Sequence, residues 1–193
     1  MKTFELEGSK REGRGKKAAK AYRKESLTPC ILYGGDEVVH FTITKESIRK
    51  LIYSPEVFTV ILSIDGKIYN AIIKETQFHP VSDALLHADF LQIFEDKPVS
   101  LEIPIVLEGL AQGVKDGGKL SQSMRKLKVK GLYKDFPEKL VINIDDLGLG
   151  KTIQVGNLHF DHLELLNGKE NVVAAVQVTR AARGTTTTPT ATK

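Results

Sequence analysis

Residues 57–75, VFTVILSIDGKIYNAIIKE, carry the strongest local structural signal in the chain. Two runs rich in β-branched and aromatic residues flank Asp65-Gly66, a pair that suits a two-residue type I′ turn. The segment therefore predicts a β-hairpin with strands over 57–64 and 67–75. This hairpin makes a β-rich fold the first expectation for the chain.

Further strands and two short helices are predicted around the hairpin. The strands are expected at residues 4–8, 30–33, 38–43 and 85–93, where apolar residues cluster or alternate with polar ones. One helix is expected at 16–24, where Ala18 and Tyr22 can face a core together. Another is expected to run from Thr44, as its N-cap, to about Tyr53.

The second half of the chain also has a β-rich pattern. Residues 94–97 and Pro98 suit a linker. Beyond it, strands are expected at 99–107, 126–132, 140–144 and 172–178, with loops at Gly113, Gly117, Gly118, Gly148 and Gly150. The fold class is thus mainly β with short helices (α+β). We expect domains at 1–93 and 94–180, and a flexible Thr-rich tail at 181–193.

The positive charge of the chain is concentrated in one short segment. The net charge is only +4, yet residues 9–24 hold eight basic residues and one acid, Glu12. Such a patch can neutralise several phosphates of a nucleic acid. It can equally be the solvated face of a helix, and the charge run alone leaves both interpretations open.

Composition favours a cytoplasmic protein without a membrane segment. Cys30 is the single cysteine, so no internal disulfide can form, as is usual in a reducing compartment. No apolar run approaches the roughly 18 residues that a membrane helix needs. The N-terminal MKTFELEGSK lacks the continuous apolar stretch of a signal peptide.

Two patterns that could belong to an enzyme are weak. Gly148–Thr152, GLGKT, ends like a phosphate-binding loop, but the pattern GxxxxGKS/T needs glycine where this chain has Asp145. An acid there would repel phosphate, so a simple β-turn is expected. The five histidines show no HxxxH or HExxH spacing, and Cys30 lies in an apolar run. We therefore expect no catalytic residue, no metal, no cofactor and no small-molecule substrate.

His87 and Asp89 lie two residues apart on a predicted strand, so their side chains should project together from one face. They could be an ordinary polar strand face or, less readily, a catalytic pair. Beside the basic segment, an RNA-contacting pair becomes the favoured interpretation. An imidazole and a carboxylate can both accept hydrogen bonds from ribose 2′-hydroxyls or base amino groups. A carboxylate near RNA indicates recognition of shape or base, because charge attraction alone would exclude it.

Several motifs together resemble the bacterial ribosomal protein family L-twenty-five, in its long two-domain form of the Ctc general-stress-protein type. In the first half they are REGRGKKAAKAYRK (11–24), PCILYGG (29–35), QFHP (77–80) and LLHADFLQI (85–93). In the second half they are EGLAQGVKDGGKLSQSMRKLKVKG (108–131), FPEKLVINIDDLGLGKTIQVGNL (136–158) and ENVVAAVQV (170–178). The resemblance covers nearly the whole chain except the Thr-rich tail.

The resemblance implies a structural constituent of the large ribosomal subunit, located with ribosomes in the cytoplasm. Its N-terminal domain would be a small β-barrel with helices that binds 5S ribosomal RNA, and a β-rich domain would follow. The contacts it implies are Arg11, Lys16, Lys20, Arg23, Tyr33, Gln77, His79, His87 and Asp89. Many relatives have consecutive arginines where this chain has Lys20 and Ala21, and lysine supplies charge without the planar fork of arginine.

Three other functions stay open. One is a small enzyme that uses the His87–Asp89 pair or the GLGKT turn. An RNA-binding stress-response protein acting away from the ribosome would also need the basic segment. A structural interaction module would suit the acidic second half, but it leaves the basic segment unexplained.

Overall fold

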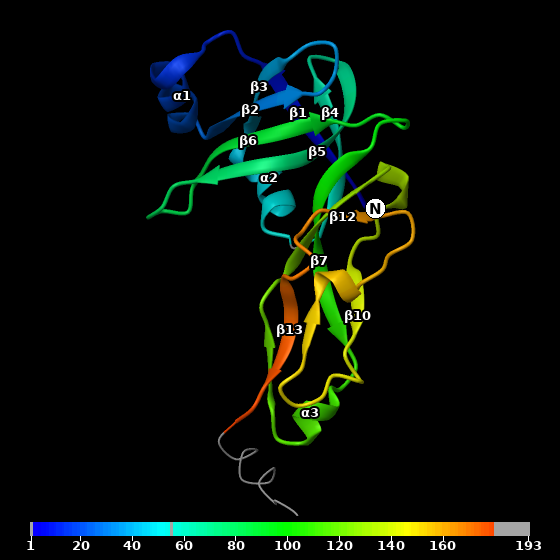
Figure 1. The fold of residues 1–193 in the computed structure, drawn as a ribbon. Coiled ribbons are helices and arrows are strands. Elements are labelled where there is room, and N and C mark those ends of the chain that lie inside the picture. Colours follow the sequence, from blue (N-terminus) through cyan, green and yellow to red (C-terminus); the bar gives the residue numbers. More distant parts are fainter. Residues whose placement is uncertain (1, 55, 180–193) are drawn as a thin grey trace, which may run out of the picture. The chain divides into compact units, whose positions relative to one another are not determined.

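The computed structural model describes residues 2–54 and 56–179, and it confirms a mainly β fold with short helices (Figure 1). The chain forms two compact units, one of residues 1–101 with 131–138 and the other of residues 102–130 with 139–193. The tail expected at 181–193 lies outside the described residues.

The first unit is built around a closed barrel of six strands in the order β1-β3-β2-β6-β5-β4. The strands are β1 (Lys2–Lys10), β2 (Leu27–Tyr33), β3 (Val39–Thr44), β4 (Phe58–Ile64), β5 (Lys67–Phe78) and β6 (Leu85–Gln92). Two parallel pairings complete the ring, β1 with β4 and β2 with β6, while the other neighbours are antiparallel. Closure pairs every strand on both sides, so no edge strand is left exposed.

The hairpin at residues 57–75 forms as the sequence predicts. β4 and β5 pair antiparallel around the two-residue turn, with Ile64 opposite Lys67. Asp65 and Gly66 both have positive φ, at 47° and 83°, as a type I′ turn requires. β5 extends beyond the predicted end to Phe78, and its register shifts between Ile73 and Glu75. Such a bulge bends a strand and helps a small sheet to close.

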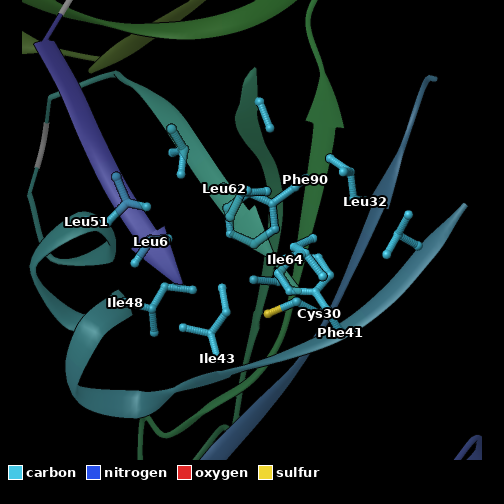
Figure 2. Packing of buried hydrophobic residues seen from close by; sticks show 14 of the residues in the cluster. Leu6, Cys30, Leu32, Phe41, Ile43, Ile48, Leu51, Leu62, Ile64 and Phe90 are labelled. Atoms are coloured by element: carbon cyan, nitrogen blue, oxygen red, sulfur yellow. The ribbon is translucent and has the colours of Figure 1, made fainter. Parts of the chain in front are cut away.

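The barrel interior is filled by aliphatic side chains around two phenylalanines (Figure 2). Phe41 and Phe90 have ring centroids 5.6 Å apart. Fully buried neighbours in Figure 2 include Leu6, Cys30, Leu32, Ile43, Ile48 and Leu62. Because residues along a strand point alternately in and out, this packing fixes which residues face outward. On β6, Ala88 and Phe90 are buried, so His87 and Asp89 lie on the outer face.

Two helices accompany the barrel. α2 (Lys45–Ile52) starts after Thr44, as expected, and buries Ile48 and Leu51. The Thr44 hydroxyl contacts the Ser47 hydroxyl at 2.6 Å and makes no hydrogen bond to a backbone N–H of the helix. α1 (Gly15–Lys24) packs against β2 without burying any residue fully. It is therefore held at the barrel surface and does not contribute to the core.

The second unit contains two small sheets, one in the order β10-β7-β9-β12 and the other β11-β13-β8. The strands are β7 (Val99–Glu108), β8 (Lys119–Gln122), β9 (Lys126–Gly131), β10 (Leu140–Asn143), β11 (Thr152–Gln154), β12 (Glu164–Leu165) and β13 (Val172–Gln177). Short helical turns lie between them, α3 (Gln112–Lys115) and η2 (Val155–Asn157), whereas η1 (Tyr133–Asp135) belongs to the first unit. The loop predicted at Gly113 is wrong, since Gly113 lies in α3. A side chain there would collide with Gly148 and Leu149, so only glycine lets these segments approach.

The GLGKT segment forms the predicted turn. The Lys151 N–H donates to the Gly148 carbonyl at 3.2 Å, and Gly150 has φ of +70°. The Asp145 carboxylate accepts a hydrogen bond from the Leu110 N–H at 2.8 Å. Asp145 thus holds a neighbouring loop, which is a structural role unrelated to phosphate.

Candidate nucleic-acid interface

A row of paired residues, polar except for Ile31, crosses the outer face of four barrel strands. Ile31 on β2 is paired with His40 on β3 and with Asp89 on β6, and Asp89 is paired in turn with Glu75 on β5. Adjacent strands lie about 4.8 Å apart, so this row places His40 and Asp89 about 10 Å from each other. The sheet register alone therefore fixes the spacing of the polar groups.

His87 and Asp89 form a hydrogen-bonded pair at the centre of this face. The His87 Nδ1 lies 2.6 Å from Asp89 Oδ1, and both side chains are partly exposed. An ionised carboxylate can only accept, so Nδ1 carries the proton and, in a neutral ring, Nε2 is an acceptor. The pair thus presents one imidazole acceptor and carboxylate oxygens, which suit hydroxyl and amino donors.

Arg11 and His40 lie beside each other on the β3 side of the row. The Arg11 N–H donates to the His40 carbonyl at 2.9 Å. Burial lowers the pKa of His40, the positive charges of Arg14 and Arg11 lower it further, and the electrostatic effect of His87 acts in the same direction. The His40 ring is therefore neutral near pH 7. Within the described residues, neither His40 Nδ1 nor Arg11 Nε has a hydrogen-bond partner, although both atoms are buried.

Tyr33 lies at the end of β2, two residues beyond Ile31 on the same face. Burial raises the pKa of its phenol, and the carboxylates of Asp89 and Glu75 raise it further. The phenol therefore keeps its proton at neutral pH and can donate a hydrogen bond. Its half-buried ring also offers an apolar surface next to the polar row.

Helix α1 supplies the positive charge next to this face (Figure 1). The Arg23 Nε donates to the Leu86 carbonyl of β6 at 3.1 Å, which ties the helix to the strand that carries His87. Lys45 Nζ donates to the Arg23 carbonyl at 2.9 Å and holds the C-terminal end of the helix. With the helix fixed in this way, Lys16 and Lys20 remain exposed to solvent.

Gln77 and His79 occupy different positions from each other. Gln77 on β5 is exposed and paired with His87, so it extends the polar face. The His79 Nδ1 accepts from the N–H groups of Val81 and Ser82, both at 3.3 Å. His79 therefore organises the loop between β5 and β6.

Sequence reasoning missed Arg14, His40 and Glu75 as members of this face. Arg14 was visible only as one charge in the basic run. His40 and Glu75 were isolated polar residues in strands whose partners the sequence does not specify. The inward-outward alternation of β3 around Phe41 was the one available signal for His40.

Other kinds of site find little support in the part of the chain that the structure describes. There, no group of three or more His, Cys, Asp or Glu side chains is arranged to hold a metal ion. Likewise, no described helix has the length and apolar character needed to cross a bilayer. The polar face on the barrel is thus the strongest candidate site.

Two family models match the chain, one to each half. The Ribosomal L25p family matches residues 6–90, and the C-terminal domain of ribosomal protein TL5 matches residues 98–180. Curated relatives carry the description large ribosomal subunit protein bL25. One from Azobacteroides pseudotrichonymphae is 66% identical over 186 residues, covering 96% of this chain and 98% of the relative. One from Parabacteroides distasonis is 61% identical over 189 residues, covering 95% and 97%. One from Bacteroides fragilis is 56% identical over 189 residues, covering 95% and 96%.

Proposed function

The chain belongs to the ribosomal L25p family, and we propose that it binds 5S ribosomal RNA through the outer face of its barrel and helix α1. As a member of this family it is a structural component of the large ribosomal subunit, associated with ribosomes in the cytoplasm, and not an enzyme. The proposal concerns the RNA partner and the residues that contact it.

The observation that carries the proposal is the hydrogen-bonded His87–Asp89 pair beside a basic helix. Positive side chains alone would favour any polyanion and would supply little selectivity. A carboxylate facing RNA is unfavourable unless it accepts a specific hydrogen bond. The combination therefore suits a folded RNA whose sugars and base edges present donors at a defined place.

In the proposed complex the two parts of the surface have different tasks. Arg11, Lys16 and Lys20 neutralise phosphates on either side of a groove. His87 Nε2 and the Asp89 carboxylate accept from ribose 2′-hydroxyls or base amino groups, which the wide minor groove of an RNA helix displays. Tyr33 donates from its phenol, and Gln77 adds an amide at the β5 side.

In the proposed complex, Arg23 and His79 have mainly structural roles. The Nε of Arg23 is used to dock α1 on β6, which leaves its terminal guanidinium nitrogens for a phosphate. His79 uses Nδ1 to order the β5–β6 loop and retains only Nε2 for a contact. Both residues therefore contribute chiefly by holding the neighbouring elements in place.

A gel-shift titration of the full chain with 5S ribosomal RNA, in the presence of excess tRNA, tests the proposal. We expect a discrete complex that survives the tRNA competitor and weakens as salt rises. Equal displacement by tRNA and by unlabelled 5S RNA would contradict selective binding. Absence of any complex at low ionic strength would overturn the proposal altogether.

A further inference from the structure

We propose that His40 is a specificity-determining residue that forms, together with Arg11, a second hydrogen-bonding edge of the RNA surface opposite the His87–Asp89 pair. The inference rests on the proposed function and assigns a role to a residue that the sequence motifs did not single out. The chemical partner of the His40 imidazole is a ribose hydroxyl or a base edge, while Arg11 contacts the adjacent phosphate.

The strand pairings place His40 and Asp89 on either side of one residue of β2. His40 and Asp89 are both paired with Ile31, from opposite sides of β2. The two polar groups therefore flank a half-buried aliphatic side chain with about 10 Å between their backbones. That distance leaves room for one sugar or base over Ile31, with hydrogen-bonding groups on both sides of it.

Two polar atoms of this edge have no hydrogen-bond partner in the described residues. His40 Nδ1 and Arg11 Nε are buried, and neither finds a partner among the described residues. Buried polar atoms without partners are rare, and a functional site is one recognised reason for them. Both side chains belong to the proposed RNA face, because His40 alternates with the buried Val39 and Phe41 on β3 and the charge of Arg11 acts on its ring.

The charged groups around His40 also suit a contact with a sugar. Arg11 and Arg14 approach it from the segment after β1, and His87 with its partner Asp89 faces it from β6 across β2. Burial and the positive charges lower the pKa of the ring, so it is neutral at pH 7. A neutral imidazole has one donor and one acceptor nitrogen, which match a ribose hydroxyl that also donates and accepts.

Because His40 Nδ1 is buried, a contact between this atom and RNA requires the side chains around it to move. Arg11 and Arg14 precede α1 and, among charged groups, have the largest electrostatic effects on the ring. In the proposed complex their guanidinium groups move onto phosphates, and this movement exposes the imidazole to the sugar or base between those phosphates. Phosphate contact and sugar contact are then made together, which couples charge attraction to selection of the correct RNA.

The test compares three substitutions of His40 in the full chain. Asn places a polar atom at about the position of Nδ1, Gln places one near Nε2, and Leu removes both. Binding of 5S ribosomal RNA and of tRNA is titrated at several salt concentrations, with thermal unfolding measured on each variant. His159→Leu, at an exposed histidine of the second unit, is the matched control.

We expect His40→Leu and His40→Gln to bind 5S RNA about five- to tenfold more weakly, the effect of losing one neutral hydrogen bond. His40→Asn should stay within about threefold of wild type. Binding to tRNA and the salt dependence should not change, since no phosphate contact is lost. The His159→Leu control should bind like wild type.

The outcomes separate this inference from the proposed function. If wild-type protein does not prefer 5S RNA over tRNA, the proposed function fails. If wild type prefers 5S RNA and all three variants equal it, only the role of His40 is overturned. Should His40→Leu unfold at a lower temperature, the comparison of Asn with Gln decides, and equal affinities of these two variants overturn the inference.

Discussion

His87 and Asp89 orient each other, and this mutual orientation gives the outer face of the barrel a defined pattern of acceptors. Their 2.6 Å contact fixes the proton on Nδ1 of the imidazole. Removing either partner leaves the other free to rotate and removes one acceptor from the surface. The consequence should appear in recognition of RNA and not in folding, because both side chains are partly exposed.

We therefore predict that His87→Ala and Asp89→Ala each weaken binding to 5S RNA roughly tenfold, as expected for one hydrogen bond to a charged or polar partner. Filter binding measures the affinity, and circular dichroism checks the fold. His159→Ala serves as the control. Wild-type affinity in both variants would exclude this pair from the interface.

Cys30 illustrates a residue whose chemistry is suppressed by its surroundings. Burial raises the pKa of its thiol to about 12, and its side chain has no exposed surface. At pH 8 only on the order of one molecule in ten thousand carries the reactive thiolate. Native protein should thus resist alkylation by iodoacetamide at pH 8, while protein in urea should react fully. Rapid labelling of folded protein would contradict this packing.

The same thiol makes stability depend on pH in a defined direction. Its pKa is about 12 in the folded state against an ordinary value of 9.0, so above pH 9 the unfolded chain loses a proton that the native chain keeps. Stability contributed by the protonated thiol is full below pH 9 and falls as pH rises towards 12.

Between pH 9 and 10.5, urea unfolding of wild type should lose about 1 to 2 kcal/mol more than that of Cys30→Ala. The variant is the control because it lacks the titrating group while its other ionisable residues stay the same. Parallel loss in both proteins would show that other groups dominate the alkaline transition.

At the scale of single residues, the sequence was informative where polar residues share one strand. Two-residue spacing was enough to place His87 and Asp89 on one face, and the structure confirms that placement. His40 and Glu75 join the same face only through pairings between different strands, and Arg14 acts on His40 from the segment before α1. Those pairings depend on barrel closure, which no local pattern encodes.

Among the elements, the β4–β5 hairpin depends most directly on local backbone conformation. Gly66 has φ of +83°. An L-residue with a side chain adopts this left-handed backbone conformation at a cost of about 1 kcal/mol or more. Apart from Gly66 and its two chain neighbours, no heavy atom lies within 4 Å of a Cβ placed at Gly66, so the cost of a side chain there comes from the local backbone conformation and not from a collision with the rest of the protein.

Gly66→Ala should therefore destabilise the protein by about 1 kcal/mol, measured by urea unfolding. Gly148→Ala is the comparison, because its φ is not positive and its Cβ would make only ordinary contacts with Lys151. That variant should be nearly neutral. A stable Gly66→Ala protein would contradict the turn type.

Helix α1 is the element on which the electrostatic part of the interface depends. Lys16 and Lys20 are exposed while Arg23 fixes the helix to β6. If each lysine meets one phosphate, removing both should lower the slope of log affinity against log salt by roughly 1 to 2 units. Titrations of Lys16→Ala/Lys20→Ala at several salt concentrations measure the change.

The matched control for the helix is Lys119→Ala/Lys126→Ala, two exposed lysines outside the barrel unit. It removes the same formal charge and should leave the slope close to that of wild type. Equal slopes for both double variants would assign the salt dependence to net charge and not to α1.

Element positions followed from the sequence wherever one pattern dominated. The hairpin, the start of α2 and β6 were predicted because turn residues, a cap and strict alternation mark them. α3 was missed because glycine at position 113 signals a loop, whereas here its missing side chain admits Gly148 and Leu149. The short strands β11 and β12 contain too few residues to show any period.

For the whole molecule, the barrel expected from family resemblance is present, and its closure explains why a basic helix and a histidine–aspartate pair meet. Parallel pairing of β2 with β6 brings together segments more than fifty residues apart in the sequence and places Ile31 opposite Asp89. Long-range pairing of this kind is decided by which core residues fit together. The sequence could therefore suggest individual contact residues, but it could not show that they lie together on one face of the barrel.

The last prediction concerns how much of the molecule the RNA requires. All six barrel strands, α1 and every proposed contact lie between Lys2 and Gln92. A closed barrel has no open edge that other segments must pair with, so we propose that residues 1–93 form an independent RNA-binding domain.

The compact unit, however, also includes residues 94–101 and 131–138, with Phe136 buried. Fragments 1–93 and 1–101 should both bind 5S RNA within about threefold of the full chain, a difference of less than about 0.7 kcal/mol, because both contain every proposed contact. The 1–93 fragment should unfold at a lower temperature. If the 1–93 fragment shows the circular dichroism of a folded β protein and yet fails to bind, the RNA surface must extend beyond the barrel and the proposed domain division is wrong.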